Sequence, residues 1–190
     1  MQSKTGGKWK IGLVDNEAKY REVFARMFTK HSDRFELKFW STAEEYLRDA
    51  SGSDLDVLYI DIELVHLDGV ELAGIAHRKY PDISLVMITV WKKDEWIFRA
   101  LRSGALGYLL KNELLDVVPY SEIILNGGGA MTPSIALRVI HNFRDEIDPD
   151  EPQLTMREKQ ILELLAAGHK NQRVADILHI KLNTVRTHIR

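Results

Sequence analysis

The sequence predicts an α/β domain, with a parallel sheet covered by helices on both faces, followed by a small all-helical domain. Short apolar runs of strand length alternate with amphipathic segments of helical spacing, as in parallel-sheet proteins. One run, residues 56–61, is apolar between Asp56 and Asp61, the carboxylate on which it ends. The acidic, proline-rich segment 145–152 then interrupts the pattern and separates the second domain.

Five segments have the length and composition of buried strands, and five have the spacing of helices. The predicted strands are residues 10–15, 35–40, 56–61, 84–89 and 107–110. The predicted helices are residues 18–31, 42–50, 69–80, 93–103 and 113–126. Strands that alternate with helices pair in parallel, so we expect a doubly wound sheet of five strands.

The domain boundaries follow from changes in composition. We expect a disordered leader at 1–8, the α/β domain at 9–127, a linker at 128–153 and the helical domain at 154–190. Within the linker, Pro133 begins a short helix that ends near Phe143.

The last domain has the pattern of a helix-turn-helix. Residues 155–158 form a capping box in front of an apolar helix face. A second helix over 170–178, a turn at 179–182 and a third helix over 183–190 complete the motif.

Composition excludes several classes of protein. The chain of 190 residues is 45% hydrophobic and contains no cysteine, which excludes disulfides and cysteine nucleophiles and favours a reducing cytoplasm. No apolar stretch approaches the ~20 residues that span a bilayer, so we expect no membrane partner. Residues 154–190 contain seven Lys/Arg and three acidic residues, which gives them a net charge of +4. Because the whole chain has a net charge of −2, the remainder has a net charge of −6. Only the second domain therefore has the net positive charge that favours binding to a polyanion.

Several polar residues end the predicted strands. The carboxyl ends of parallel strands meet at one edge of a sheet, where open α/β sheets bind their ligands. Acidic and amide oxygens suit Mg²⁺, and a carboxylate beside that ion can attack a phosphoryl group to give an acyl phosphate. Lysine and hydroxyl groups can then bind the oxygens of the transferred phosphoryl group. The converging residues are Asp15, Asn16, Asp61, Thr89 and Lys111.

Each of these residues also has a structural explanation. A carboxylate after a strand can cap a helix, and Thr89 is a β-branched strand residue. Tyr108 fits an apolar core, and Lys111 fits a solvated surface.

Four segments together resemble the receiver domain of bacterial two-component response regulators. They are residues 14–17, 58–63 with 68–69, 88–89 and 104–111, in the order and at the separations of that family. The resemblance covers residues 9–127. It implies a flavodoxin-like fold, phosphorylation of Asp61 by a histidine kinase, and a switch in which Thr89 moves to the phosphoryl group and the Tyr108 ring moves inward. The metal site that it implies comprises Asp15, Asn16, Asp61 and Glu63, the last by its backbone or carboxylate.

Three residues depart from that family's pattern around the pocket. Asn16 replaces a second acid, which lowers the charge available to Mg²⁺. Val65 stands in place of proline, and Val90 in place of a small residue.

The last domain resembles the LuxR-type helix-turn-helix of the NarL/FixJ subfamily, through residues 154–158, 167–168, 174–175 and 184–189. The resemblance implies that residues 183–190 enter the major groove of DNA. The implied DNA-binding residues are Lys181, Asn183, Thr184, Arg186, Thr187 and Arg190. Since the sequence ends at Arg190, within that helix, we expect an incomplete domain. The residues expected to lack part of their apolar cover are Ile177, Leu178, Val185 and Ile189.

The leading hypothesis is a transcriptional regulator, not an enzyme, in which phosphorylation of Asp61 gates DNA binding and promotes a homodimer. One alternative is a DNA-binding or interaction protein that acts without phosphorylation, as Asn16, Val65 and Val90 would favour. The other is a phosphatase with Asp61 as nucleophile.

Overall fold

The computed structural model describes residues 7–145 and, further along, residues 160–161, 163–165, 169, 171–178, 180–182 and 184–185. The chain divides into two compact units, residues 1–143 and 144–190. No helix within the described ranges is long and apolar enough to cross a membrane.

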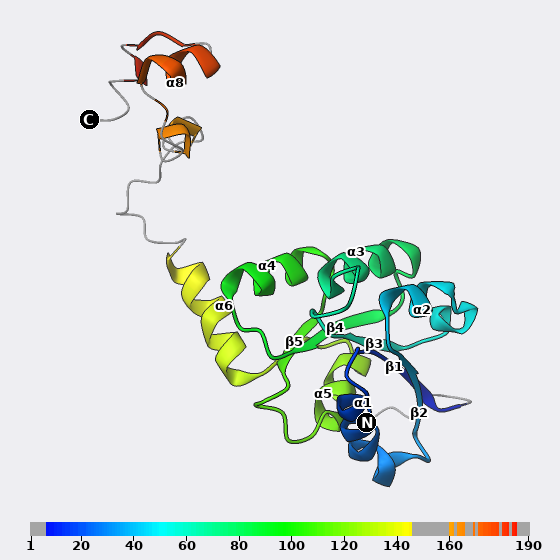
Figure 1. Ribbon diagram of the computed structural model, residues 1–190. Coiled ribbons are helices and arrows are strands. Elements are labelled where there is room, and N and C mark those ends of the chain that lie inside the picture. The colour runs from blue at the N-terminus through cyan, green and yellow to red at the C-terminus, as the bar shows by residue number, and fades with distance from the viewer. Residues whose placement is uncertain are drawn as a thin grey trace. The chain divides into compact units, whose positions relative to one another are not determined.

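The first unit is built on a parallel sheet with the strand order β2-β1-β3-β4-β5-β6 (Figure 1). Its strands are β1 (Trp9–Val14), β2 (Phe35–Trp40), β3 (Val57–Ile60), β4 (Ser84–Thr89), β5 (Gly107–Leu110) and β6 (Ala130–Met131). Every neighbouring pair of these strands runs parallel. The five predicted strands are all present, each within one residue of its expected ends.

Helices cover both faces of this sheet, as predicted. They are α1 (Ala18–Met27), α2 (Ala43–Arg48), α3 (Gly69–Lys79), α4 (Asp94–Arg102), α5 (Val118–Leu125) and α6 (Pro133–Asp145), with short 3₁₀ turns η1 (Thr29–His31) and η2 (Ala50–Ser53). Helices α2, α3 and α4 lie on one face, and α1 and α5 on the other (Figure 1). Helix α5 begins later than expected, because residues 113–117 form a loop.

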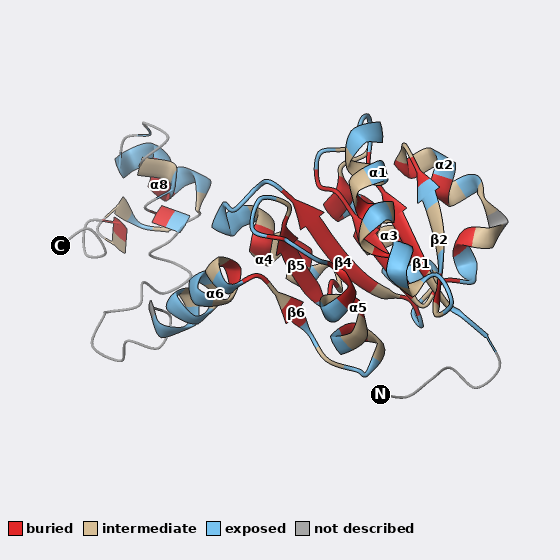
Figure 2. Cartoon of the chain, turned by 90° about the horizontal axis from the view of Figure 1, so that it is seen from below, coloured by how far each residue is buried: buried red, intermediate tan, exposed pale blue. Residues whose placement is uncertain are grey.

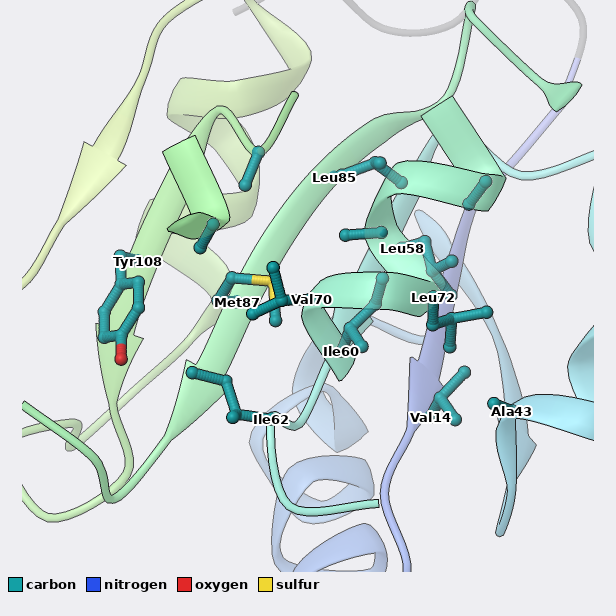
Figure 3. Packing of buried hydrophobic residues seen from close by; sticks show 14 of the residues in the cluster. Val14, Ala43, Leu58, Ile60, Ile62, Val70, Leu72, Leu85, Met87 and Tyr108 are labelled. Carbon is teal, nitrogen blue, oxygen red and sulfur yellow. The ribbon is translucent and has the colours of Figure 1, made fainter. Parts of the chain in front are cut away.

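Two apolar clusters fill the space between the helices and the sheet. In β3, Leu58 and Ile60 face the first cluster, whereas Val57 and Tyr59 face the second. All four side chains are buried, because a central parallel strand is covered on both faces (Figure 2). Figure 3 shows the first cluster, in which Leu72 of α3 packs over the sheet and the Tyr108 ring of β5 is also buried.

The sheet has one strand more than the five that the sequence predicted. Strand β6 pairs with the start of β5, and a Cβ atom on Gly107 would lie 2.7 Å from the carbonyl oxygen of Ala130. Glycine at 107 therefore permits the close approach of β6. Because Ile135 of α6 is fully buried in the first cluster, residues 130–143 of the expected linker 128–153 pack with the first unit. A strand of two residues has no periodicity that sequence reasoning can detect.

The second unit contains α8 (Asn171–Ile177), within one residue of the predicted helix 170–178 at each end. Its buried cluster comprises Ile161, Val174, Ala175 and Val185. Val185 is fully buried, contrary to the expectation that it lacks apolar cover, whereas Ile177 is exposed as expected. The predicted capping box at 155–158 lies outside the described residues.

Candidate functional site

Asp15 and Asp61 lie next to each other at the carboxyl edge of the sheet. Each follows the last residue of a strand, β1 or β3, and the Asp61 amide donates a hydrogen bond to the Val14 carbonyl at 2.9 Å. Strand order reverses at this point, because β2 lies on one side of β1 and β3 on the other. Open α/β sheets bind ligands at such a switch point.

Lys111 brings a positive charge between these two carboxylates. It follows β5, and its amide donates to the Thr89 carbonyl at 2.8 Å, which places it at the same edge. Its Nζ lies 2.7 Å from Oδ2 of Asp15 and 2.7 Å from Oδ2 of Asp61. The contact with Asp61 has hydrogen-bond geometry. Oδ2 of Asp15 is buried and has, among the described residues, no hydrogen-bond partner besides its contact with the ammonium group.

Backbone groups orient both carboxylates. Oδ1 of Asp15 accepts a hydrogen bond from the Glu17 amide at 2.8 Å, and Oδ1 of Asp61 accepts one from the Glu63 amide at 3.3 Å. The other oxygen of each group therefore faces Lys111. Gly69, the first residue of α3, completes the support: a Cβ atom there would lie 1.8 Å from the Asp61 carbonyl oxygen.

Burial and charge set the ionisation of this cluster. Burial raises the pKa of Asp15, although the contact with Lys111 partly offsets that rise. Burial lowers the pKa of Lys111, but its contacts with Asp15 and Asp61 outweigh burial and leave that pKa above its ordinary value. The lysine is therefore charged at neutral pH, and the two carboxylates share one cation.

Thr89 and Tyr108 are connected through Trp91 in the loop after β4. The Trp91 amide donates to Oγ1 of Thr89 at 3.4 Å. The Tyr108 hydroxyl donates to the Trp91 carbonyl at 2.7 Å. Both predicted switch residues are fully buried, so the Tyr108 ring already lies inward. Burial raises the pKa of Tyr108, as does the nearby charge of Asp61.

Asn16 and Glu63, the other two predicted metal ligands, are exposed. Oε2 of Glu63 accepts a hydrogen bond from the indole Nε1 of Trp91 at 3.4 Å, away from the Asp15 carboxylate. Among the described residues, no three Asp, Glu or His side chains form a group that could hold a metal ion. The donors that fit a hard cation are Asp15 and Asp61, whose buried Oδ2 atoms face each other across Lys111.

The two other departures from the receiver pattern lie at exposed positions. Val65 is 48% exposed and Val90 is 53% exposed. Neither residue is therefore packed into the apolar interior.

Sequence reasoning missed three residues at this site. The Tyr20 ring of α1 lies 4.3 Å from Nζ of Lys111. Arg21 Nη1 donates to the Asp15 carbonyl at 2.5 Å. Trp91 joins Thr89, Tyr108 and Glu63, as described above. Trp91 lies two residues after Thr89, and Tyr20 and Arg21 lie in the first turn of α1. No sequence pattern marked any of the three as functional.

Most of the predicted DNA-binding residues lie outside the described part of the chain; these are Asn183, Arg186, Thr187 and Arg190. Of the other two, Lys181 is exposed and Thr184 is half-buried. The Thr184 and Val185 amides donate to the Lys181 carbonyl at 2.9 and 3.3 Å, which is the hydrogen bonding of a helical turn.

Known protein families match both parts of the chain. The family described as response regulator receiver domain matches residues 11–118, more than half of the chain. The chain is a response regulator. The family of bacterial regulatory proteins called luxR matches residues 152–190. This response regulator therefore combines a receiver domain with a LuxR-type helix-turn-helix, the NarL/FixJ arrangement of a two-component transcription factor, as the sequence predicted.

Characterised relatives cover nearly the whole response regulator. It is 23% identical over 200 residues to the transcriptional regulatory protein DegU of Brevibacillus brevis, covering 96% of this chain and 85% of DegU. It is 26% identical over 181 residues to the response regulator protein VraR of Staphylococcus aureus, covering 95% of this chain and 86% of VraR. A solved structure of the RcsB response regulator of Salmonella typhimurium matches with a TM-score of 0.74 at 16% identity, covering 95% of this chain and 89% of that one. At that identity the structural likeness shows the fold alone.

Proposed function

We propose that Asp61 accepts a phosphoryl group from a histidine kinase and that this modification controls DNA binding by the helix-turn-helix unit. The observation that carries the proposal is the pairing of the Asp61 and Asp15 carboxylates with one buried ammonium group, that of Lys111, at the switch point of the sheet. A receiver domain implies a kinase partner, and a LuxR-type domain implies DNA.

The transfer would begin with attack by a carboxylate oxygen of Asp61 on the phosphorus of a phosphohistidine. The new P–O bond forms as the P–N bond breaks, and the imidazole leaves with a proton. Asp61 is held for this attack by the Glu63 amide on Oδ1 and by Lys111 on Oδ2. Lys111 then pairs with the oxygens of the acyl phosphate, since its charge is already in place.

We propose Mg²⁺ as the cofactor. The ion, when bound, would neutralise charge between the carboxylates and the phosphoryl oxygens. Asp15 and Asp61 would hold it, and the buried Oδ2 of Asp15, which accepts no hydrogen bond from the backbone, fits that role. Asn16 and Glu63 are exposed; Asn16 would add its side-chain amide oxygen, and Glu63 would add an oxygen of its backbone or its carboxylate. With two carboxylates and a competing lysine, affinity for Mg²⁺ is expected to be weak.

The signal would leave the site through Trp91. A phosphoryl group on Asp61 attracts the Thr89 hydroxyl, which then gives up the Trp91 amide. That change moves the loop whose carbonyl accepts the Tyr108 hydroxyl. Because the Tyr108 ring is already buried, phosphorylation in this chain would shift its hydrogen-bond partner rather than bring the ring inward.

We further propose that the active form is a homodimer on DNA. One relative has been solved as two RcsB dimers bound to two parallel DNAs. On this chain the exposed Lys181 would contact the phosphate backbone, with Asn183, Thr184, Arg186, Thr187 and Arg190 on the recognition helix.

The test is phosphorylation by acetyl phosphate with Mg²⁺, followed by intact mass, in the wild type, D61N and N16D. The proposal predicts one added phosphoryl group in the wild type, none in D61N, and faster modification of N16D because a third acid strengthens metal binding. An unmodified wild type, or a D61N variant that is modified as fully, would contradict it.

A second candidate function is regulation without phosphorylation. It is favoured by the exposed, uncharged Asn16 and by Lys111, which occupies the space between the two acids. Beryllofluoride, a phosphoryl mimic, distinguishes the two functions: a change of oligomeric state with Mg²⁺ supports the phosphorylated switch, and no change supports this alternative.

The phosphatase alternative has less support. It needs an acid beside Asp61, and the nearby Glu63 side chain binds the Trp91 indole instead. Phosphatase turnover no higher than that of D61N would exclude it.

A further inference from the structure

Tyr20 forms one wall of the pocket that holds Lys111. The Lys111 ammonium lies 4.3 Å from the centre of the Tyr20 ring, and it also lies 2.7 Å from an oxygen of Asp15 and from one of Asp61. The cation thus has an aromatic ring as well as two carboxylates around it. Its side chain is only 8% exposed, so little water competes with these contacts.

The hydroxyl of Tyr20 makes no hydrogen bond in this arrangement, although it lies within range of the charges of Asp15 and Asp61. It is buried, and within the described part of the chain it has no hydrogen-bond partner. A buried hydroxyl without a partner costs stability relative to a phenylalanine ring of the same shape. The contact that Tyr20 makes with the site is therefore the contact of its ring with Lys111.

The Tyr20 ring attracts Lys111 to its present position, whereas a divalent cation bound at this site would displace it. A cation held by Asp15 and Asp61 would need the Oδ2 atoms that now face the ammonium group, so Lys111 must give way when the ion enters. A cation over an aromatic face is attracted to it, most strongly where water is excluded. The Tyr20 ring therefore stabilises the arrangement that the metal must displace.

We propose that Tyr20 is a positioning residue that holds Lys111 between Asp15 and Asp61 and thereby weakens Mg²⁺ binding at this site. This role concerns Mg²⁺ binding at the proposed phosphorylation site. Only its consequence, the degree to which phosphorylation depends on Mg²⁺, rests on the proposed function. In the resting protein Lys111 serves as an internal counter-ion, and Tyr20 keeps it there.

The test is calorimetric titration of the unphosphorylated full chain with MgCl₂. Y20L removes the ring and keeps an apolar side chain, so Mg²⁺ should bind about 3- to 10-fold more tightly than in the wild type. Y20F keeps the ring and should bind Mg²⁺ within about twofold of the wild type, while unfolding at a higher temperature because the unpartnered hydroxyl is gone. A merely structural role for Tyr20 would not separate these two variants in this way.

Each outcome decides the inference. Unchanged or weaker Mg²⁺ binding in Y20L overturns it, as does a Y20F variant that behaves like Y20L. If the wild type binds no measurable Mg²⁺, the inference predicts that Y20L gains binding, and failure to gain it overturns the inference too. Y20M, which fills similar space without a ring, replaces Y20L if that variant does not fold. Failure of the proposed function is a separate result, because it appears as an unmodified wild type with acetyl phosphate.

Discussion

The Tyr108 hydroxyl donates a hydrogen bond to the Trp91 carbonyl at 2.7 Å and so ties strand β5 to the loop that follows Thr89. The Trp91 amide in turn binds the Thr89 hydroxyl. One residue of the loop thus contacts both proposed switch residues, Thr89 through its amide and Tyr108 through its carbonyl. The loop can therefore transmit a change at one of them to the other.

Removing the Tyr108 hydroxyl should uncouple the loop from β5. We expect Y108F to lose about 1 kcal/mol of unfolding free energy, measured in urea, because one partly buried hydrogen bond is lost. Y59F is the matched control: Tyr59 is also buried, and its hydroxyl lies 2.7 Å from that of Ser121 in the other apolar cluster. Both variants should lose similar stability, but only Y108F should alter the response of Trp91 to beryllofluoride. Equal responses in the two variants would contradict this route.

The Thr89 hydroxyl should be necessary for that response. In T89V the side chain keeps its shape but cannot bind a phosphoryl group or the Trp91 amide. Fluorine NMR of fluorotryptophan-labelled protein follows Trp91, whose signal is assigned by its loss in W91F. We expect beryllofluoride with Mg²⁺ to shift this signal in the wild type and in T89S, and to leave it in place in T89V. A full shift in T89V would show that the signal bypasses Thr89.

Gly69 should tolerate no side chain. A Cβ atom there would lie 1.8 Å from the Asp61 carbonyl oxygen, so the backbone beside Asp61 must move. We expect G69A to lose about 3 kcal/mol of unfolding free energy. G74A on the same helix is the control, because its Cβ would meet nothing closer than 3.5 Å, and it should gain about 0.5 to 1 kcal/mol. A similar change of unfolding free energy in G69A and G74A would mean that the contact with Asp61 does not limit which residue fits at position 69.

Asp15 should cost stability at neutral pH. Burial raises its folded pKa above the ordinary value of 3.8. The folded state therefore holds the proton more firmly than the unfolded state, and the resulting stabilisation is complete below pH 3.8 and is lost as pH rises through the folded pKa. Asparagine cannot ionise, so D15N should be more stable than the wild type at pH 7, and the difference should shrink toward pH 4.

Urea unfolding at several pH values measures this difference. D82N, which alters an exposed acid, should match the wild type throughout. A D15N variant less stable than the wild type at pH 7 would show that attraction to Lys111 outweighs the burial of Asp15.

The main features of the sheet edge could be predicted from the sequence because they depend on strand position. The run Val57–Ile60 is apolar on both faces, which marks a central parallel strand, and the next residue, Asp61, must then lie at its carboxyl end. The same reasoning placed Asp15, Thr89 and Lys111 beside it. Their convergence follows from topology and needs no knowledge of side-chain rotamers.

The contacts of Tyr20 and Trp91 could not be predicted in this way. Tyr20 reaches Lys111 only because the fold brings α1 close to the residue that follows β5, and sequence spacing does not specify that geometry. Trp91 lies in a loop, where backbone direction decides which group its carbonyl meets. Strand β6 escaped prediction for another reason, since its two residues form no pattern.

The most direct test of the account is to map the phosphorylated residue itself. The full chain is treated with acetyl phosphate and Mg²⁺, reduced with borohydride, which converts an aspartyl phosphate to homoserine, and sequenced by tandem mass spectrometry. The account predicts homoserine at position 61, in amounts that fall when Mg²⁺ is chelated, and none at Asp15. An unmodified Asp61 under these conditions, or homoserine at another aspartate in its place, would contradict it.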